Sequence, residues 1–455
     1  MRMFDRRFLA ALFFCALVLA SCGGKRAAIK QPPADSAPSP QKEPITQPPV
    51  SPVQPPAAEE ERPVIPLEEA PRVRVLVLGA QQAVRMRVLS AFRVGTLADG
   101  EPLATIERGG DFTVKASGGQ VVLAAGKRRL ISSGSLLVRP VEGACVFVGG
   151  KPYRGIMLFR ATEGGVMAIN ILDIDEYIKG VLPSEIGYLK PGQFEAYRAQ
   201  AIAARSYALS KLEEKTADIY DLNATVMDQV YSGAGGESEA ASRAVDETRG
   251  LVCTFLGEPI KAYYCSCCGG HTADIRTVWP WKTPYPYLYG VRDTVRETSG
   301  ESLCRASRHF RWRVHWSAST LAGILRKTVP RELKVPARGV GKLADIRVIG
   351  TGPDGRVLGI EIVTDRESFE VLGDRIRWAM KPDPASDAIL RSTLFKLDVS
   401  IAGGRIAAID MLGGGNGHGV GMCQTGAIRM AEIGYSGEEI IRHYYPGSTI
   451  EPLYR

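Results

Sequence analysis

An α+β fold is predicted by two features of this sequence: short β-type runs that begin near Arg72, and a helical repeat of apolar residues that follows them. The β-type runs are separated by Gly, Ser, Asp or Lys, as strands joined by turns are. The helical repeat places apolar residues at steps of three and four: Phe194, Tyr197, Ala201, Ala204, Ala208 and Leu212. We therefore expect a β-rich N-terminal part, a central alanine-rich packing helix, and further strands and Gly-rich loops that line a groove.

The strand signals continue beyond that helix. Runs at 346–349 and 357–363 flank the turn sequence Gly352-Pro353-Asp354-Gly355, which predicts a β-hairpin. We expect a β-rich part over residues 72–165 and a core domain over residues 166–455, with a hairpin-containing insertion at about 305–400.

Composition bounds the problem without solving it. The chain has 455 residues, of which 45% are hydrophobic and 23% are charged, and these are ordinary globular values. This length predicts a tail with one elaborated domain or two. The formal net charge of +8 favours anionic partners, such as nucleic acid, phospholipid head groups or acidic polysaccharide, and does not choose among them.

The N-terminus has the pattern of an export signal. Arg2, Arg6 and Arg7 precede an apolar run from Phe8 to Ala20, which is too short to span a bilayer. The run ends in Leu-Ala-Ser-Cys22, which resembles a bacterial lipobox, in which the cysteine carries the lipid. We expect residues 1–21 to be a lipoprotein signal peptide; a plain signal peptide that happens to contain Cys22 is the alternative.

Export would place the protein outside the cytoplasm, anchored to a membrane and facing the periplasm or the cell wall. Nucleic acid is then largely out of reach, and we find no nucleic-acid-binding module. Membrane lipid and cell wall remain as the abundant anionic partners. Residues 22–71 are dominated by Pro, Ala, Ser, Gln and Glu, so we expect a disordered tether that lets the folded domain reach into the wall.

The first candidate for chemistry is Glu185, which stands two residues after Pro183 and just before the loop that leads into the alanine-rich helix. A carboxyl group held on a loop by a packed helix can act as a general acid, because burial raises its pKa. By residue type alone, a solvated surface position or a helix cap is the commoner role of such a glutamate.

The sequence around Glu185 resembles a known family. The segments that carry the resemblance follow one another in order: Tyr177 to Glu185, Ala199 to Leu209, Asp228 to Gly233, Gly269 to Thr272, Val278-Trp279, Pro286 to Leu288, Gly417 to Met422 and His443 to Gly447. Together they are similar to the motifs of the stage II sporulation protein D and amidase-enhancer family. The resemblance covers roughly Arg72 to the C-terminus.

The resemblance implies binding to peptidoglycan glycan strands. In the sporulation branch, members act as lytic transglycosylases that prefer strands stripped of their stem peptides, whereas the amidase-enhancer branch is credited with stimulating a partner cell-wall amidase. Membership does not decide between the two activities. Glu185 matches the family's catalytic glutamate.

A lytic transglycosylase needs one carboxyl group, whereas the common glycosidase mechanisms need two. Glu185 would protonate the glycosidic oxygen and then accept the proton of the muramic acid 6-hydroxyl as that oxygen closes onto C1. Stripped muramic acid also exposes a lactyl carboxylate, for which Arg205 is a candidate partner. A structural ion pair within the helix is an equally good interpretation of Arg205.

Cysteines near a Gly-Gly pair form a second candidate site. Cys268 and His271 have a short spacing that lets a thiolate and an imidazole bind one ion, and Cys265 and Cys304 could complete a tetrahedral structural zinc site. Some family members look metal-binding in this region. A disulfide such as Cys268 to Cys304 is the alternative, because an oxidising compartment permits it.

The third candidate is the glycine-rich run from Gly413 to Gly426, which lacks the Gly-Lys-Ser/Thr of a phosphate-binding loop. Its glycines permit close backbone approach, which suits the floor of a sugar-binding groove. His418 could hydrogen-bond substrate or Glu185, and a structural role in the turn is nearly as good an interpretation. The remaining substrate-binding candidates are Gln424, Asp228, Gln229 and Tyr231.

Overall fold

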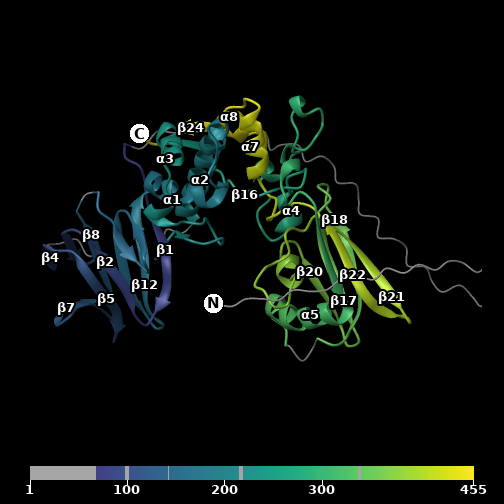
Figure 1. The fold of residues 1–455 in the computed structure, drawn as a ribbon, viewed down its shortest axis with the longest axis horizontal. Helices are drawn as coiled ribbons and strands as arrows, with labels where there is room; N and C mark the ends of the chain where they lie inside the picture. The colour runs from purple at the N-terminus through teal and green to yellow at the C-terminus, as the bar shows by residue number, and fades with distance from the viewer. Residues whose placement is uncertain (1–67, 98–101, 142, 215–218, 337–339) are drawn as a thin grey trace, which may run out of the picture. The chain divides into compact units, whose positions relative to one another are not determined.

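The computed structural model describes residues 68–97, 102–141, 143–214, 219–336 and 340–455. Cys22, the expected signal peptide and the expected tether up to residue 67 lie outside these ranges. The α+β class is confirmed, with a β-rich N-terminal part followed by a central helix (Figure 1).

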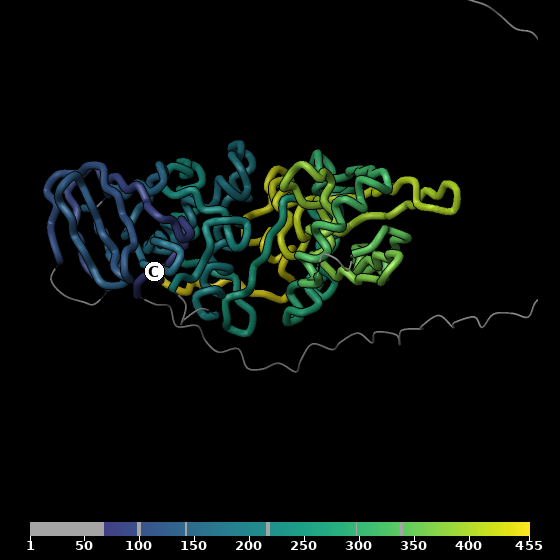
Figure 2. The backbone as a smooth tube through the Cα atoms, turned by 90° about the horizontal axis from the view of Figure 1, so that it is seen from below, coloured from purple at the N-terminus to yellow at the C-terminus, as the bar shows by residue number. Residues whose placement is uncertain are grey.

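Two sheets make up the N-terminal part. The first has the order β13 (Leu222–Asn223), β1 (Arg72–Gln81), β12 (Gly165–Asp173), β11 (Ile156–Thr162), β8 (Ser135–Pro140), β3 (Phe92–Gly95) and β4 (Ala104–Ile106). The second has the order β10 (Lys151–Tyr153), β9 (Val146–Val148), β2 (Val84–Val88), β5 (Gly110–Ser117), β6 (Gln120–Ala125) and β7 (Arg128–Ser133). The strands of these sheets are the purple and blue segments of Figure 2, except for β13.

Alternation of side chains explains how these sheets pack. In β2, Val84, Met86 and Val88 are buried while Arg85 and Arg87 are exposed, so one face of the strand is apolar. The rings of Phe92 in the first sheet and Phe112 in the second meet edge to face, with centroids 5.2 Å apart. The apolar faces of the two sheets therefore share one core.

A helical part begins directly after β12. Its helices are α1 (Ile174–Ile186), α2 (Phe194–Glu214), α3 (Glu239–Glu247), α4 (Ile275–Val278), α7 (Gln424–Glu432) and α8 (Gly437–Tyr444). Short 3-10 turns are η1 (Pro191–Gln193), η2 (Gly233–Gly236), η3 (Pro286–Leu288), η4 (Arg296–Thr298) and η5 (Leu303–Ala306). Small sheets complete this part: β15 (Glu258–Pro259), β14 (Leu251–Phe255) and β24 (Thr449–Pro452), and the parallel pair β16 (Tyr264–Cys265) and β23 (Met422–Cys423).

The alanine-rich helix α2 is the centre of this helical part. Its buried alanines are Ala196, Ala199, Ala201, Ala203, Ala204 and Ala208. Helices α1, α3, α7 and α8 and strand β14 all pack against it, because side chains of one carbon let neighbouring backbones come close. At the start of α8 the approach is so close that a Cβ on Gly437 would lie 2.8 Å from the Cβ of Arg198.

Residues 312–413 form a second core of their own. It contains a sheet of β17 (Trp312–Ser317), β22 (Arg405–Gly413) and β21 (Phe395–Ala402), and a sheet of β18 (Leu343–Thr351), β19 (Val357–Thr364) and β20 (Ser368–Leu372). Helices α5 (Ala318–Leu333) and α6 (Arg375–Ala379) complete it. β18 and β19 pair antiparallel, as the turn sequence between them predicts. β21 and β22 form a long hairpin (Figure 2). Trp312 at the start of β17 pairs with Gly413 at the end of β22.

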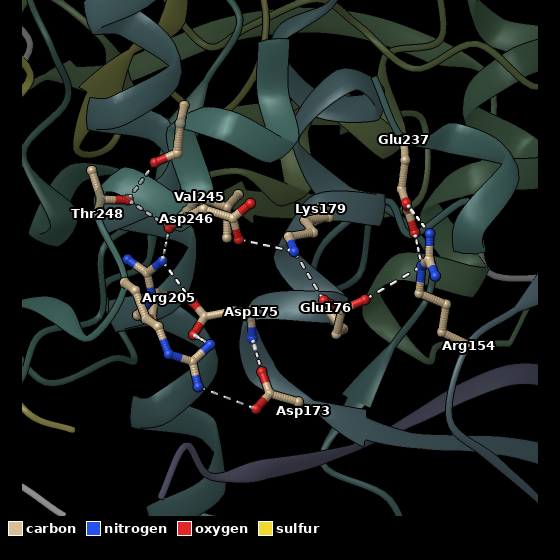
Figure 3. A network of polar contacts seen from close by, with 12 residues as sticks. Arg154, Asp173, Asp175, Glu176, Lys179, Arg205, Glu237, Val245, Asp246 and Thr248 are labelled. Atoms are coloured by element: carbon tan, nitrogen blue, oxygen red, sulfur yellow. Dashed lines mark hydrogen bonds and ion pairs between the residues drawn. The ribbon is translucent and has the colours of Figure 1, made fainter. Parts of the chain in front are cut away.

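An ion pair is buried where α1, α2 and the C-terminus meet (Figure 3). Arg205 is fully buried, and its guanidinium lies 2.7 Å from the Asp175 carboxylate and donates to the backbone oxygens of Leu251 and Val245. The other oxygen of Asp175 accepts from Arg249 and from the Tyr454 hydroxyl. The substrate-binding interpretation of Arg205 is therefore wrong, because every part of its side chain is inaccessible and engaged in the core.

This geometry predicts a large cost for removing the charge of Asp175. Asp175→Asn leaves the Arg205 guanidinium buried beside a neutral amide, so the free energy of unfolding should fall by about 3–5 kcal/mol. Glu247→Gln is the matched control. Glu247, at the end of α3, pairs with the half-exposed Arg198 of α2, so losing this ion pair should cost less than about 1 kcal/mol. Urea denaturation of both variants measures the difference, and equal losses would contradict this account of the pair.

Candidate functional site

Glu185 lies in the last turn of α1, not in a loop as the sequence suggested. The helix ends at Ile186 because Gly187 adopts φ 84° and ψ −171°, which no helix continues. The half-buried Glu185 side chain accepts a hydrogen bond of 2.5 Å from the backbone N–H of Val230. A regular helix therefore fixes the carboxyl group on one side, and the 228–231 segment fixes it on the other.

Burial raises the pKa of Glu185 from its usual 4.5 to about 7, against the opposing effect of the Val230 N–H, which lowers it. The carboxyl group also contributes, after burial, to the raised pKa of Tyr264, so the phenol lies within its field. A carboxyl group that is half protonated near neutral pH can donate a proton in one step and accept one in the next.

Gln229 connects the elements around Glu185 through hydrogen bonds of its side chain. Its amide nitrogen donates to the Tyr264 hydroxyl at 3.0 Å and to the Ala204 carbonyl at 3.3 Å, and its oxygen accepts from the Tyr177 hydroxyl at 3.1 Å. Gln229 is fully buried. The substrate-binding interpretation of Gln229 is wrong, because its side chain instead joins α1, α2 and β16.

Tyr231 is also a core residue. It is 3% exposed and donates from its hydroxyl to Asn170 Oδ1 at 2.9 Å. Its ring lies so close to α1 that a Cβ on Gly180 would come within 2.5 Å of it. The prediction that Tyr231 binds substrate is therefore wrong as well.

A pocket of about 180 Å³ adjoins this segment. Its lining consists of Tyr207, Lys211, Val226, Met227, Asp228, Ala262, Tyr263, Tyr264, Trp279, Lys282 and His418. Two predicted substrate-binding residues, Asp228 and His418, thus face one space. Glu185 is outside this lining and is connected to it through its hydrogen bond to the 228–231 segment and its proximity to Tyr264.

A larger hollow of about 970 Å³ lies on the second N-terminal sheet, and two of its three charged lining residues, Arg87 and Asp111, pair with each other 2.6 Å apart. Asp228 in the smaller pocket is held firmly: Oδ1 accepts from the Tyr207 hydroxyl at 3.0 Å, and Oδ2 accepts from the backbone and side-chain nitrogens of Asn223, both at 2.8 Å. We place the candidate site at the smaller pocket because it is the one beside a carboxyl group with a raised pKa.

The imidazole of His418 forms part of the pocket wall. Nδ1 accepts from the Val420 N–H at 3.1 Å, and the ring also hydrogen-bonds with the backbone of Tyr264. Burial, followed by the charges of Arg377 and Lys282, lowers the pKa of His418 to about 3. His418 is therefore neutral at physiological pH, and its bonds go to the protein backbone and not to Glu185.

The sequence reasoning missed the aromatic and basic lining of this pocket. Lys282 lies over the Trp279 ring at 4.0 Å from its centroid and donates to the Tyr263 hydroxyl at 3.0 Å. The Trp279 ring packs in turn against His418, with ring centroids 4.9 Å apart and the ring planes tilted by 39°. The one sequence feature that could have predicted this lining is the clustering of Tyr, Trp and Lys over residues 263–282. These residues follow no helical or strand periodicity, so the sequence does not show that their side chains face one space.

Gln424 is buried at the start of α7 and donates to Gln200 Oε1 at 3.3 Å. Its side chain is therefore part of the contact between α7 and α2. The substrate-binding interpretation of Gln424 is wrong for the same reason as that of Arg205, since neither side chain is accessible.

A separate group of buried side chains could hold a metal ion. Ligand atoms of Cys268, Asp293, Cys304 and Cys423 all lie within 4.8 Å of one another. Two of the four predicted ligands, Cys268 and Cys304, are thus brought together, with their sulfurs 3.7 Å apart. Both are free thiols, since a disulfide bond would need about 2.05 Å.

The other two predicted ligands are not in this group. His271 Nδ1 hydrogen-bonds with the Thr272 carbonyl at 2.7 Å, and Cys265 lies in β16, in register with Cys423. Asp293 and Cys423 stand in their places. Sequence spacing could not find Cys423, because it comes 155 positions after Cys268 and reaches it only through the fold.

Comparisons with known proteins match two parts of the chain. The family model described as stage II sporulation protein matches residues 162–255, which contain Glu185 and helices α1 and α2. A family described as a domain of unknown function matches residues 273–421.

Relatives cover a larger share. An uncharacterized protein of Brachyspira hyodysenteriae is 29% identical over 67% of this chain and 73% of its own length. The amidase enhancer of Bacillus subtilis is 26% identical over 80% of this chain and 52% of its own length, so the chain spans about half of that protein. Stage II sporulation protein D of Bacillus amyloliquefaciens is 28% identical over 69% of this chain and 83% of its own length. The family resemblance inferred from the motifs is confirmed.

The raised pKa of Glu185 predicts a pH-dependent stability. The native state keeps a proton that the unfolded chain releases above about pH 4.5, so this stability is complete below that pH and is lost as the pH rises through about 7. The shift is worth about 3 kcal/mol. Glu185→Gln removes the titration, so the variant should match wild type at about pH 4 and exceed it by up to that amount at about pH 8. Urea titrations at both pH values measure this, and a pH-independent difference would contradict it.

Proposed function

We propose that this chain, which belongs to the stage II sporulation protein D and amidase-enhancer family, is a lytic transglycosylase that cleaves peptidoglycan glycan strands stripped of their stem peptides. The observation that carries the proposal is Glu185: a half-buried carboxyl group with a pKa of about 7, within the residues that match the family model. Its role would be that of the acid and the base of one reaction.

The chemistry needs no second carboxylate. Protonated Glu185 gives its proton to the glycosidic oxygen as the bond from that oxygen to C1 of muramic acid breaks. The resulting carboxylate takes the proton of the 6-hydroxyl as O6 bonds to C1, which closes a 1,6-anhydro ring and returns Glu185 to its starting form. No water is consumed, and the acetamido group next to C1 can assist.

The state of Asp228 favours this reaction over hydrolysis. Inverting and retaining hydrolases require a second carboxylate that is free to activate water or attack C1. Both oxygens of Asp228 are already occupied, one by Tyr207 and the other by Asn223. Asp228 is therefore suited to shaping the pocket and not to acting as a base.

The pocket fits an acidic sugar. The aromatic rings of Trp279 and Tyr263 line the pocket and give a pyranose ring an apolar surface to pack against. Lys282 brings positive charge to the same space, as does Lys211, which also pairs with Glu214 at 2.6 Å, and this charge suits the lactyl carboxylate of stripped muramic acid. Lys211 and Lys282 would thus bind the lactyl carboxylate, the role predicted from the sequence for Arg205.

Glu185→Gln keeps the shape of the side chain and removes its proton, so release of 1,6-anhydromuramic products from stripped glycan strands should fall by about 100-fold or more while strand binding persists. Mass spectrometry of the products and a strand pull-down measure the two properties. Glu176→Gln, on the same helix but in a surface ion pair with Lys179, is the matched control and should keep full activity. Unchanged product release by Glu185→Gln would contradict the proposal.

Stimulation of a partner cell-wall amidase is the second candidate function. It is favoured by the match between an amidase enhancer and 80% of the length of this chain, at 26% identity. In that case wild-type protein would yield no anhydromuramic products and would raise the rate of an added amidase on intact peptidoglycan. The Glu185→Gln variant would raise that rate by the same factor. The two functions thus differ in a single pair of assays.

We also propose that the protein is exported and lipid-anchored through Cys22, outside the described residues, because the sequence before it resembles a lipobox. Among the described helices none is long and apolar enough to cross a membrane. Cys22→Ala should move the protein from the membrane fraction to the soluble fraction, whereas Cys15→Ala, inside the apolar run, should leave it on the membrane. Immunoblotting of the fractions measures this, and soluble wild-type protein would contradict the anchor.

A further inference from the structure

The cysteine group stands apart from the chemistry of Glu185 and is built from four distant stretches of chain. Cys268 follows β16, Asp293 lies in the loop after η3, Cys304 is in η5, and Cys423 is the N-cap of α7. All four are buried, with exposures of 0% for each cysteine and for Asp293. Three thiols and a carboxylate gathered in one buried group are residue types that bind metal ions.

The spacing of the sulfurs suits one metal ion. Zinc–thiolate bonds of about 2.3 Å in a tetrahedron place neighbouring sulfurs about 3.8 Å apart. The Cys268 and Cys304 sulfurs are 3.7 Å apart, and all the ligand atoms are within 4.8 Å of one another. That separation is too long for a disulfide and matches the sulfur–sulfur spacing of a tetrahedral zinc site.

The surroundings are arranged for negatively charged sulfur. The Cys423 sulfur accepts from the backbone N–H of Cys268 at 3.2 Å, and the Cys268 sulfur accepts from the N–H of Gly270 at 3.4 Å. Backbone donors of this kind orient and stabilise metal-bound thiolates. Asp293 is held in place by the Tyr444 hydroxyl at 2.7 Å and the Cys304 N–H at 3.0 Å.

A buried positive charge lies beside the group. Arg356 is fully buried and donates from Nη2 to the Cys268 carbonyl at 2.7 Å. Its Nε and Nη1 have no hydrogen-bond acceptor in the described part of the chain, and the Asp354 carboxylate is 3.6 Å away. Three thiolates and a carboxylate around a divalent ion carry a net charge of −2, and the Arg356 guanidinium, which also pairs with Asp354, would offset part of it.

We propose that Cys268, Cys304, Cys423 and Asp293 bind one Zn²⁺ as a closed structural site. Soft thiolate ligands in a tetrahedral group select zinc over the oxygen-preferring Mg²⁺ and Ca²⁺. Four protein ligands leave no position for a water nucleophile, so the ion stabilises the fold and takes no part in bond cleavage. Cys267, which hydrogen-bonds with Cys304 and Cys423, lies next to the site.

Such an ion would fasten the wall of the candidate pocket. The parallel pair of β16 and β23 carries Tyr264 at one end and Cys423 at the other, and Cys268 follows β16 by three positions. Zinc would therefore tie the segment after Tyr264 to the start of α7 and to η5. This consequence holds whether the protein is a transglycosylase or an enhancer.

The test begins with the full-length wild-type chain, purified without chelators. Elemental analysis should find about one zinc per chain, and a thiol-blocking reagent should release it to a colorimetric zinc indicator. Replacement by Co²⁺ should give the visible absorption bands of a tetrahedral thiolate site. These measurements need no variant, so they remain valid even if cysteine substitutions impair folding.

Variants then assign the ligands. Cys304→Ser and Cys423→Ser should each lose at least about 10-fold in zinc affinity and lower the melting temperature of the zinc-loaded protein. Cys253→Ser is the matched control, because Cys253 is an equally buried free thiol that hydrogen-bonds with Ser448 outside the group. It should keep its zinc. Absence of zinc from folded wild-type protein, a Cys268–Cys304 disulfide in its peptide map, or zinc retained by Cys304→Ser would each overturn the proposal.

Discussion

Close packing on α2 is the constraint on which the helical part of this protein depends. Alanines along the helix leave room for α1, α3, α7 and α8 to approach its backbone, and each of the four packs against it. The buried pair of Arg205 and Asp175 lies within this packing and specifies how α1 and α2 meet. Such a pair contributes less to net stability than to the choice of a single arrangement, because its desolvation offsets much of its attraction.

The environment of Glu185 follows from that arrangement. Because α1 is fixed against α2, its last turn faces the 228–231 segment, and Gln229 bonds to both helices and to β16. The carboxyl group is thereby held in a partly dry position with a single backbone donor. The raised pKa is thus a property of helix packing, and residues that never touch a ligand, such as Gln229 and Tyr231, help to set it.

Sequence patterns predicted the parts of this structure that local chemistry determines. The α+β class, the alanine-rich helix and the hairpin at Gly352 to Gly355 follow from periodicity and turn residues, which act within a few positions. The accessibility of Arg205, Gln229, Tyr231 and Gln424 does not, because it depends on which distant elements cover them. Arg205, Gln229 and Tyr231 lie in segments that carry the family resemblance, and all four side chains are buried in the core.

The cysteine group also shows that sequence spacing cannot predict which distant residues meet. The prediction correctly placed Cys304 beside Cys268, 36 positions away. The short spacing from Cys268 favoured His271, whose ring instead hydrogen-bonds with the carbonyl of Thr272. Cys423 and Asp293 could be found only once β16 and β23 lay side by side, because no spacing rule connects residues so far apart. A ligand set assembled from several elements is therefore a property of the topology.

The pairing of Trp312 with Gly413 has a consequence for the order of folding. It brings together the two ends of the 312–413 region, which has a core of its own, so this region can form before the rest of the chain closes around it. Once it has formed, the chain between β16 and β23 behaves as a much shorter loop, and each halving of loop length lowers the entropic cost of closure by about 0.6 kcal/mol. The parallel β16–β23 pair joins residues far apart in sequence, so it would form late. The shortened loop would keep the entropic cost of that pairing low, and the pairing would complete the wall of the pocket.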